Sequence, residues 1–135
     1  MDAAHLKSIS LFAPLADEDL NVIAAFAEEV SVPEGKKLIN EGDYAYELMA
    51  IEEGTARVER GGEHVADLKA GDFFGEVGVV ESERRNASVI ATSPMRLIVL
   101  TRWEIKRLEK RVPEAIEQLR SAIEQRRPQL ESHSG

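Results

Sequence analysis

The middle of this chain consists of short apolar segments separated by turn signals, and this rhythm constrains the fold more than any other feature. The turn signals are glycine-containing stretches at 33–35, 41–43, 53–54, 61–62 and 70–72. Short apolar runs between such turns are typical of a small antiparallel β-barrel or jelly roll. The pattern therefore predicts strands over residues 37–40, 47–51, 55–60, 64–68, 87–91 and 95–100.

The dipeptide Gly61-Gly62 joins two of these strands, and two glycines at this point favour a tight hairpin turn. Side chains alternate between the two faces of a strand. Every second residue of the strand before the turn, including Ala56 and Val58, is therefore expected to face the inside of the roll.

Helical periodicity flanks the predicted strands on both sides. On the N-terminal side, Asp17 is expected to cap a helix whose apolar positions, Leu20, Ile23, Ala27 and Val30, recur at helical spacing. On the C-terminal side the helical period returns after residue 101. The sequence thus predicts one helix, then the roll, then two helices.

Prolines mark the expected limits of the last helix. Pro113 is suited to its first turn, and Pro128 is expected to end it. Residues 128–135 are then expected to form a disordered tail, which leaves a single domain over residues 1–127. The predicted fold class is α+β, an antiparallel, jelly-roll-like β-roll flanked by an N-terminal helix and C-terminal helices.

Composition excludes several classes of function. The 135 residues suit one domain, and with no cysteine the chain has neither disulfides nor thiolate-ligated clusters. The formal net charge of −8 disfavours direct binding to nucleic acid. No apolar run approaches the roughly 20 residues of a membrane span, and the N-terminus lacks a signal-peptide pattern. We expect a cytoplasmic chain without a membrane span.

One acidic and one basic residue stand out within residues 71–91. Glu76, flanked by small residues, lies nine positions before Arg85. A carboxylate accepts hydrogen bonds from sugar hydroxyls, and an arginine grips a phosphate with two parallel N–H donors. Glycines beside them allow close approach of the backbone to a ligand. The combination suits a compact molecule with a ribose at one end and a phosphate at the other.

These residues resemble the phosphate-binding cassette of cyclic nucleotide-binding domains. The family pattern is Phe-Gly-Glu with aliphatic and small residues, then a variable segment and Arg-x-Ala-Ser/Thr-Val. In this chain the pattern reads Phe74-Gly75-Glu76-Val77-Gly78-Val79-Val80, followed by Arg85-Asn86-Ala87-Ser88-Val89. The similarity extends over about residues 6–127, and it implies a short helical turn at residues 75–80 inside the roll, with N-terminal amides directed at the phosphate.

The resemblance implies a role for each residue of the cassette. Arg85 is expected to bind the exocyclic oxygens of the cyclic phosphate, and Glu76 to accept a hydrogen bond from the ribose 2′-hydroxyl. The alternatives are a surface ion pair of Arg85 with Glu81 or Glu83, and a carboxylate at Glu76 that serves only the fold.

The smaller residues of the cassette are assigned to its backbone. Gly75 and Gly78 are expected to allow close packing, and Asn86 and Ala87 to offer backbone N–H groups to the phosphate. Asn86 carries both a donor and an acceptor, so it also suits a purine edge. The choice between cAMP and cGMP stays open, with prevalence among bacterial relatives favouring cAMP.

The resemblance also places the purine. Val58 and Val65 match positions that contact the base in the bacterial catabolite activator, although both also suit the roll core. The positions that close over the base there align with Leu130 and Glu131, beyond Pro128. Arg126 or Arg127 is an alternative cap, since a guanidinium stacks on a purine face.

The expected function is a regulatory module that binds cAMP or cGMP, performs no chemistry and needs no metal or cofactor. Its expected partner is a protein or a fused effector domain, with a possible homodimer through the C-terminal helix. One alternative is a degenerate fold that serves as a ligand-independent interaction module, with residues 116–123 as its contact. A cupin-type enzyme is disfavoured because the three histidines are far apart in sequence and only His64 lies in the roll.

Overall fold

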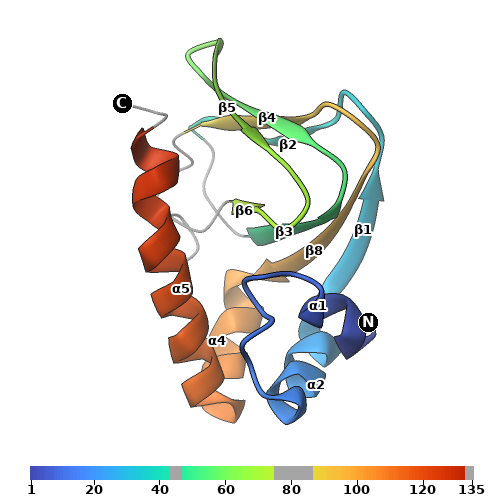
Figure 1. Ribbon diagram of the computed structural model, residues 1–135, viewed down its shortest axis with the longest axis vertical. Coiled ribbons are helices and arrows are strands. Elements are labelled where there is room, and N and C mark those ends of the chain that lie inside the picture. The colour runs from blue at the N-terminus through green and yellow to red at the C-terminus, as the bar shows by residue number, and fades with distance from the viewer. Residues whose placement is uncertain (43–46, 75–86, 133–135) are drawn as a thin grey trace.

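The protein consists of a β-roll with helices packed at one end, as the computed structural model shows (Figure 1). The structure describes residues 1–42, 47–74 and 87–132, and in the last helix it describes side chains only through Ala122 and at Gln125. The helices of this part are α1 (Ala3–Lys7), α2 (Asp17–Phe26), α4 (Arg102–Arg111) and α5 (Pro113–Ser132). The strands are β1 (Glu28–Val32), β2 (Lys37–Ile39), β3 (Glu47–Glu53), β4 (Ala56–Arg60), β5 (Glu63–Leu68), β6 (Phe73–Phe74), β7 (Ser88–Ala91) and β8 (Met95–Thr101).

The strands form two antiparallel four-stranded sheets. The strand order is β1-β8-β3-β6 in the first sheet and β2-β7-β4-β5 in the second. The predicted α+β fold with an antiparallel roll is confirmed, and the six predicted strands are present with ends shifted by at most two residues. Because β6 belongs to the first sheet and β7 to the second, residues 75–86 connect one sheet to the other.

The central strands of the first sheet, β8 and β3, are buried on both faces, and residues 97–100 of β8 show why the sequence there is an unbroken apolar run. Leu97 and Val99 face the inside of the roll, in a cluster with residues of the second sheet. Ile98 and Leu100 face the other way and pack with the helices. Each such side chain contributes about 1.5–3 kcal/mol when it is fully buried. The sheet therefore joins two hydrophobic cores, one inside the roll and one under the helices.

The hairpin between β4 and β5 forms where the double glycine predicts it. Gly61 and Gly62 have φ values of 59° and 82°, which match the two left-handed positions of a type I′ turn. Val58 of β4 packs against the core inside the roll, as its alternation predicts.

The N-terminal helix of the prediction differs from the structure at both ends. The residue at the N-cap of α2 is Ala16, and Asp17 is the first helical residue, where its charge suits the positive end of the helix. The helix ends at Phe26, and Val30 lies in β1 opposite Leu97 of β8. The helical spacing of Val30 is therefore coincidental, because pairing with β8 satisfies the backbone hydrogen-bonding groups of residues 28–32.

Besides β1, two further elements were absent from the predicted order. Helix α1 has only five residues, and the Asp2 side chain caps it by accepting a hydrogen bond from the Ala4 amide. Strand β6 has two residues and exists through its pairing with β3. Both are too short for a periodic signal.

The C-terminal helices begin where expected, but the last one extends further. Thr101 and Glu104 form a capping box at the start of α4, and α5 begins at Pro113. The prediction that Pro128 ends α5 is wrong, because the helix continues to Ser132. A proline removes one hydrogen bond of the ladder and clashes with the preceding turn, a cost of about 3 kcal/mol, but it does not forbid a further turn.

Candidate functional site

The N-terminal approach to the cassette is anchored inside the roll. Phe74 of β6 is 4% exposed and pairs with Met49 of β3, and both side chains belong to the roll core. Phe73 points the opposite way, into the core under the helices. Adjacent phenylalanines on opposite faces thus fix the two-residue strand between both cores.

The C-terminal exit from the cassette is anchored in the second sheet. Ala87 is 8% exposed, and the strand β7 begins at the next residue. The Ser88 hydroxyl accepts a hydrogen bond from the Glu41 amide at 3.0 Å, while the Glu41 carboxylate accepts one from the Gly61 amide at 3.0 Å. Two turns and the start of β7 are therefore joined at this edge of the roll.

Most residues predicted to touch the ligand lie between these anchors. Gly75, Glu76, Val77, Gly78, Arg85 and Asn86 lie outside the described residues, and their predicted roles stay predictions. Of the cassette residues predicted to contact the ligand, the structure describes Phe74 and Ala87, both buried.

Of the two residues predicted for the base, Val58 has the better-defined place. It lies opposite Val89 of β7, two residues beyond Ala87, so it stands on the strand next to the cassette exit. Val65 is half-buried and is the additional residue where the pairing of β4 with β5 shifts in register. A bulge redirects side chains locally, so the sequence pattern alone does not decide which face Val65 occupies.

The residues considered as a cap for the base all lie within α5. Arg126, Arg127, Leu130 and Glu131 fall inside the helix that runs to Ser132, so Leu130 and Glu131 do not lie beyond its end. Their side chains lie outside the described part of the chain.

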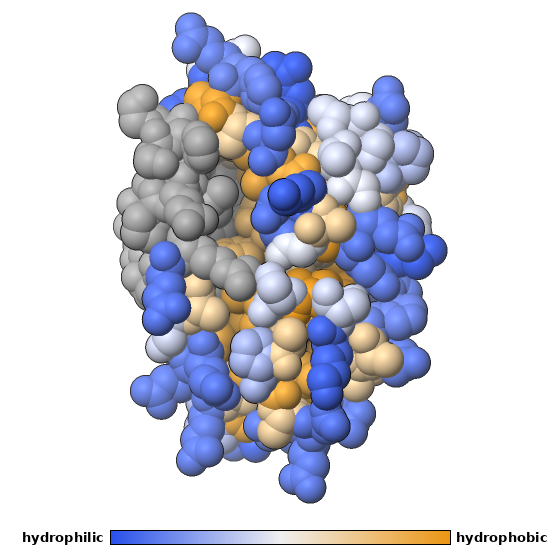
Figure 2. Space-filling model, viewed as in Figure 1, coloured by the Kyte–Doolittle hydropathy of each residue, from blue (hydrophilic) through white to orange (hydrophobic). Residues whose placement is uncertain are grey.

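The first half of α5 uses its apolar face inside the molecule. Ile116 and Leu119 are each 1% exposed and belong to the core under the helices. These two side chains are therefore not available for contact with a second copy. Figure 2 shows polar residues over most of the face drawn, with hydrophobic residues mainly along its middle.

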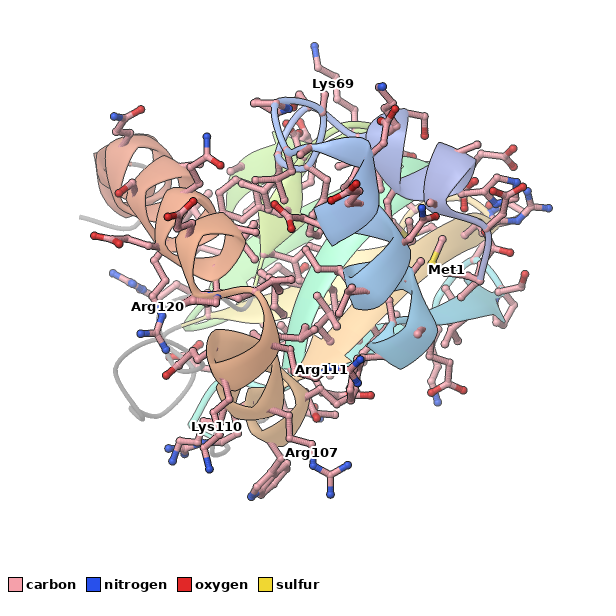
Figure 3. All side chains as sticks on the ribbon, turned by 90° about the horizontal axis from the view of Figure 1, so that it is seen from below. Met1, Lys69, Arg107, Lys110, Arg111 and Arg120 are labelled. Carbon is pink, nitrogen blue, oxygen red and sulfur yellow. The ribbon has the colours of Figure 1, made fainter. Side chains whose placement is uncertain are left out.

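Helix α4 presents a basic face to solvent. Lys106, Arg107 and Lys110 are exposed on the side opposite the buried Ile105 and Leu108, and Figure 3 shows Arg107 and Lys110 pointing away from the body of the molecule. The Arg111 guanidinium lies 5.7 Å from the centre of the Phe26 ring, a cation–π contact that ties α4 to α2.

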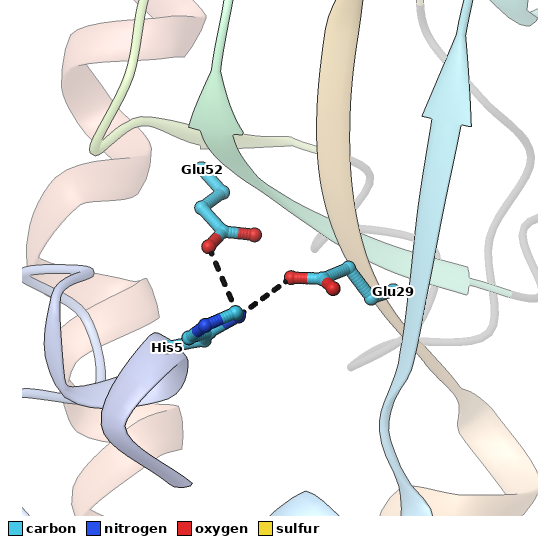
Figure 4. A group of neighbouring side chains, drawn as sticks. All are labelled: His5, Glu29 and Glu52. Carbon is cyan, nitrogen blue, oxygen red and sulfur yellow. Dashed lines mark hydrogen bonds and ion pairs between the residues drawn. The ribbon is translucent and has the colours of Figure 1, made fainter. Parts of the chain in front are cut away.

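A cluster that the sequence did not predict consists of residues outside the cassette. His5 of α1, Glu29 of β1 and Glu52 of β3 converge (Figure 4). His5 Nδ1 is 2.9 Å from Glu29 Oε2 and 3.3 Å from Glu52 Oε1. The spacing of the histidines does not reveal this cluster, because it combines one histidine of a helix with one glutamate from each of two strands.

The three groups shift one another's ionisation. Burial, and then the neighbouring Glu29 carboxyl, raise the pKa of Glu52 to about 7. The hydrogen bond shared with Glu52, and then the one with His5, lower the pKa of Glu29. The hydrogen bond to Glu29, and then the charge of Glu52, raise the pKa of His5.

Comparison with known proteins places the chain in a family. The sequence profile described as "Cyclic nucleotide-binding domain" matches residues 29–111. A cAMP-dependent protein kinase regulatory subunit from Hypocrea atroviridis is 32% identical over 103 residues, which cover 76% of this chain and 22% of that protein. The chain therefore spans about a fifth of that relative's length.

Solved structures share the fold. A cyclic nucleotide-binding domain from Methylobacillus flagellatus superposes with a TM-score of 0.84 at 23% identity, covering 98% of this chain and 77% of that one. The catabolite activator protein of Thermus thermophilus superposes with a TM-score of 0.77 at 27% identity, covering 90% and 59%. Among the described residues, no helix combines the length and apolar character that crossing a membrane requires. The profile match spans more than half of the chain, which therefore belongs to the cyclic nucleotide-binding domain family.

Proposed function

We propose that this chain is a regulatory module that binds cAMP or cGMP and performs no chemistry of its own. One observation carries the proposal: residues 75–86, which contain Glu76 and Arg85, connect two facing sheets between the buried anchors Phe74 and Ala87. The proposal is supported by the family match and by the names of relatives, which include cAMP-dependent kinase regulatory subunits and a cyclic AMP receptor protein.

In this proposal the two ends of the ligand meet different residues. Arg85 binds the exocyclic phosphate oxygens, the amides of residues 75–78, 86 and 87 surround the phosphate, and Glu76 accepts a hydrogen bond from the 2′-hydroxyl. Val58 provides an apolar wall for the purine. The acidic net charge does not oppose this, because a single guanidinium fixed beside the phosphate dominates at contact distance.

Binding would shift the position of the C-terminal helices. In the proposed mechanism the cassette closes on the phosphate, and its apolar residues transmit the change to α4 and α5, which follow β8 directly. The output is a protein partner or an effector domain of the same protein, in the cytoplasm. The exposed basic face of α4 is a suitable surface for such a contact.

Calorimetry on the purified chain tests this function. The parent protein is expected to bind cAMP or cGMP saturably, and linear 5′-AMP much more weakly. Arg85→Ala should lower the affinity by about thirtyfold or more, since a charge-assisted contact of about 2 kcal/mol is lost. The neighbouring Arg84→Ala is the matched control and should bind like the parent. Parent-like binding by the Arg85 variant, or no binding by folded parent protein, would contradict the proposal.

A further inference from the structure

The cluster of His5, Glu29 and Glu52 contains a buried carboxylate oxygen without a hydrogen-bond partner. The Glu52 side chain is only 11% exposed, and its Oε2 atom is buried and accepts no hydrogen bond from the described residues. Its other oxygen, Oε1, faces the imidazole at 3.3 Å. Burying a carboxylate costs several kcal/mol unless positive charge and hydrogen bonds compensate for the lost water.

The nearby charges on the protein supply little of this compensation. The Glu29 carboxylate is a second negative group in the same place, and one imidazole lies between the two acids. The charge of Arg96 of β8 acts on both carboxylates, but its guanidinium is 3.5 Å from the carboxylate of the exposed Glu53. A cation held among the three side chains would balance both carboxylates at once.

The two donor separations that involve His5 suit a small cation. One atom from each of His5, Glu29 and Glu52 lies within 4.8 Å of the other two. With metal–ligand bonds of about 2.05 Å, donor separations of 2.9 and 3.3 Å correspond to ligand–metal–ligand angles of about 90° and 110°. Both angles fall within four- or five-coordinate geometry.

We propose that His5, Glu29 and Glu52 form a binding site for a divalent cation of the zinc type, with water in the remaining positions. Imidazole nitrogen with carboxylate oxygen is a donor set that zinc accepts, whereas calcium and magnesium prefer oxygen ligands alone. The bound cation links α1 to β1 and β3, the two strands on either side of β8 in the first sheet, and so fixes the N-terminal helix to the roll.

A competing explanation is that a protonated His5 alone bridges the two acids. Hydrogen bonds between His5 and both carboxylates would then hold α1 in place, and added metal would bring no stabilisation. The two explanations give opposite results when zinc is added to chelator-treated protein.

The test is a calorimetric titration of the full chain with zinc chloride alone, together with thermal unfolding in the presence and absence of zinc. The parent protein is expected to bind one zinc ion and to unfold at a higher temperature when zinc is present. His5→Gln and Glu52→Gln should each weaken zinc binding tenfold or more. Glu29→Gln, at a more exposed position, gives the same test if either of those variants fails to fold.

The control uses a second histidine with the same kind of neighbour. His64 Nε2 lies 2.9 Å from Asp67 Oδ1 in an exposed pair that lacks a third ligand among the described residues. His64→Gln should therefore bind zinc like the parent. The proposal is overturned if the parent shows no saturable binding, if His5→Gln binds as tightly as the parent, or if magnesium binds as tightly as zinc. Because the titration contains no nucleotide, its outcome is independent of the proposed regulatory function.

Discussion

Phe74 of β6 lies directly across from Met49 of β3, and both side chains are buried inside the roll. Phe74 is also the residue at which the predicted cassette begins. The preceding residue, Phe73, pairs with Ala50 and is buried in the other core, under the helices. The two phenylalanines are 3% and 4% exposed, so they are almost equally buried but lie in different cores. Substitutions at the two positions can therefore distinguish an effect on the stability of the fold from an effect on the cassette.

Phe74→Ala and Phe73→Ala are each expected to lower the free energy of unfolding by about 3–5 kcal/mol, because each leaves a cavity in a packed core. Urea denaturation measures this loss. Only Phe74→Ala is expected to weaken cyclic nucleotide binding as well, since Phe74 is the anchor on the roll side. Binding should be measured at a temperature at which both variants are folded. Equal losses of affinity in the two variants would contradict this role of Phe74.

The turn at Gly54 has no room for a side chain. Its φ is +99°, and a Cβ atom built there would come within 2.5 Å of the Pro94 carbonyl oxygen and 2.8 Å of Met95 Cγ. Gly35 has a similar φ of +88°, but nothing lies within 4 Å of such an atom. Gly35→Ala should cost roughly 1–2 kcal/mol of backbone strain, whereas Gly54→Ala should cost that plus about 1–3 kcal/mol of steric overlap. If urea denaturation gives the same free energy of unfolding for the two variants, the turn at Gly54 relaxes to accommodate the added methyl group.

The stability of metal-free protein should depend on pH through Glu52. Its pKa rises from 4.5 in the unfolded chain to about 7 in the folded one, so between these values the folded state binds the proton more tightly. Stability should then fall as pH rises from about 4.5 to about 7. The raised pKa of His5 acts in the same direction, since its contribution is full below 6.5 and is lost as pH rises through the folded value.

Glu29 has the opposite sign and acts in a more acidic range. Its lowered pKa contributes stability above 4.5 that is lost as pH falls through the folded value. The charge of Arg96 lowers the pKa of both carboxyls without cancelling the effect of burial on Glu52. Thermal unfolding from pH 5 to 8 with a chelator present should show a shallower decline for Glu52→Gln than for the parent. The neighbouring, exposed Glu53→Gln should keep the parent slope, and identical profiles for all three proteins would refute the assignment.

The roll was predictable from sequence because its signals are local. Turns such as Gly61-Gly62 require left-handed backbone, and short segments between turns, such as residues 95–100, have room for one strand each. Strand β1 was not predictable in this way, because its sequence also fits a helix and only its pairing with β8 decides the outcome. The end of α5 was also not predictable, because a proline usually ends a helix but Pro128 does not end this one.

The two candidate sites also differ in how far the sequence predicts them. The spacing of Glu76 and Arg85 is a sequence signal, and the structure adds the buried anchors on either side of the segment that contains them. The cluster of His5, Glu29 and Glu52 has no such signal, because its members are 23 or more positions apart and meet only in the folded sheet. Spatial convergence of distant residues requires the tertiary structure.

The proposed contact between Glu76 and the ribose predicts a specific coupling. The 2′-deoxy form of the preferred cyclic nucleotide should bind the parent at least tenfold more weakly, because a hydrogen bond to a charged group contributes about 1.5–3 kcal/mol. In Glu76→Ala the two ligands should bind alike, since the hydroxyl no longer has its acceptor, and the mutation and the ligand change should therefore be non-additive. Glu81→Ala, in the same segment, should keep the parent's preference. Calorimetry with both ligands on all three proteins measures this coupling, and a full preference for the hydroxyl in Glu76→Ala would assign the ribose contact to another residue.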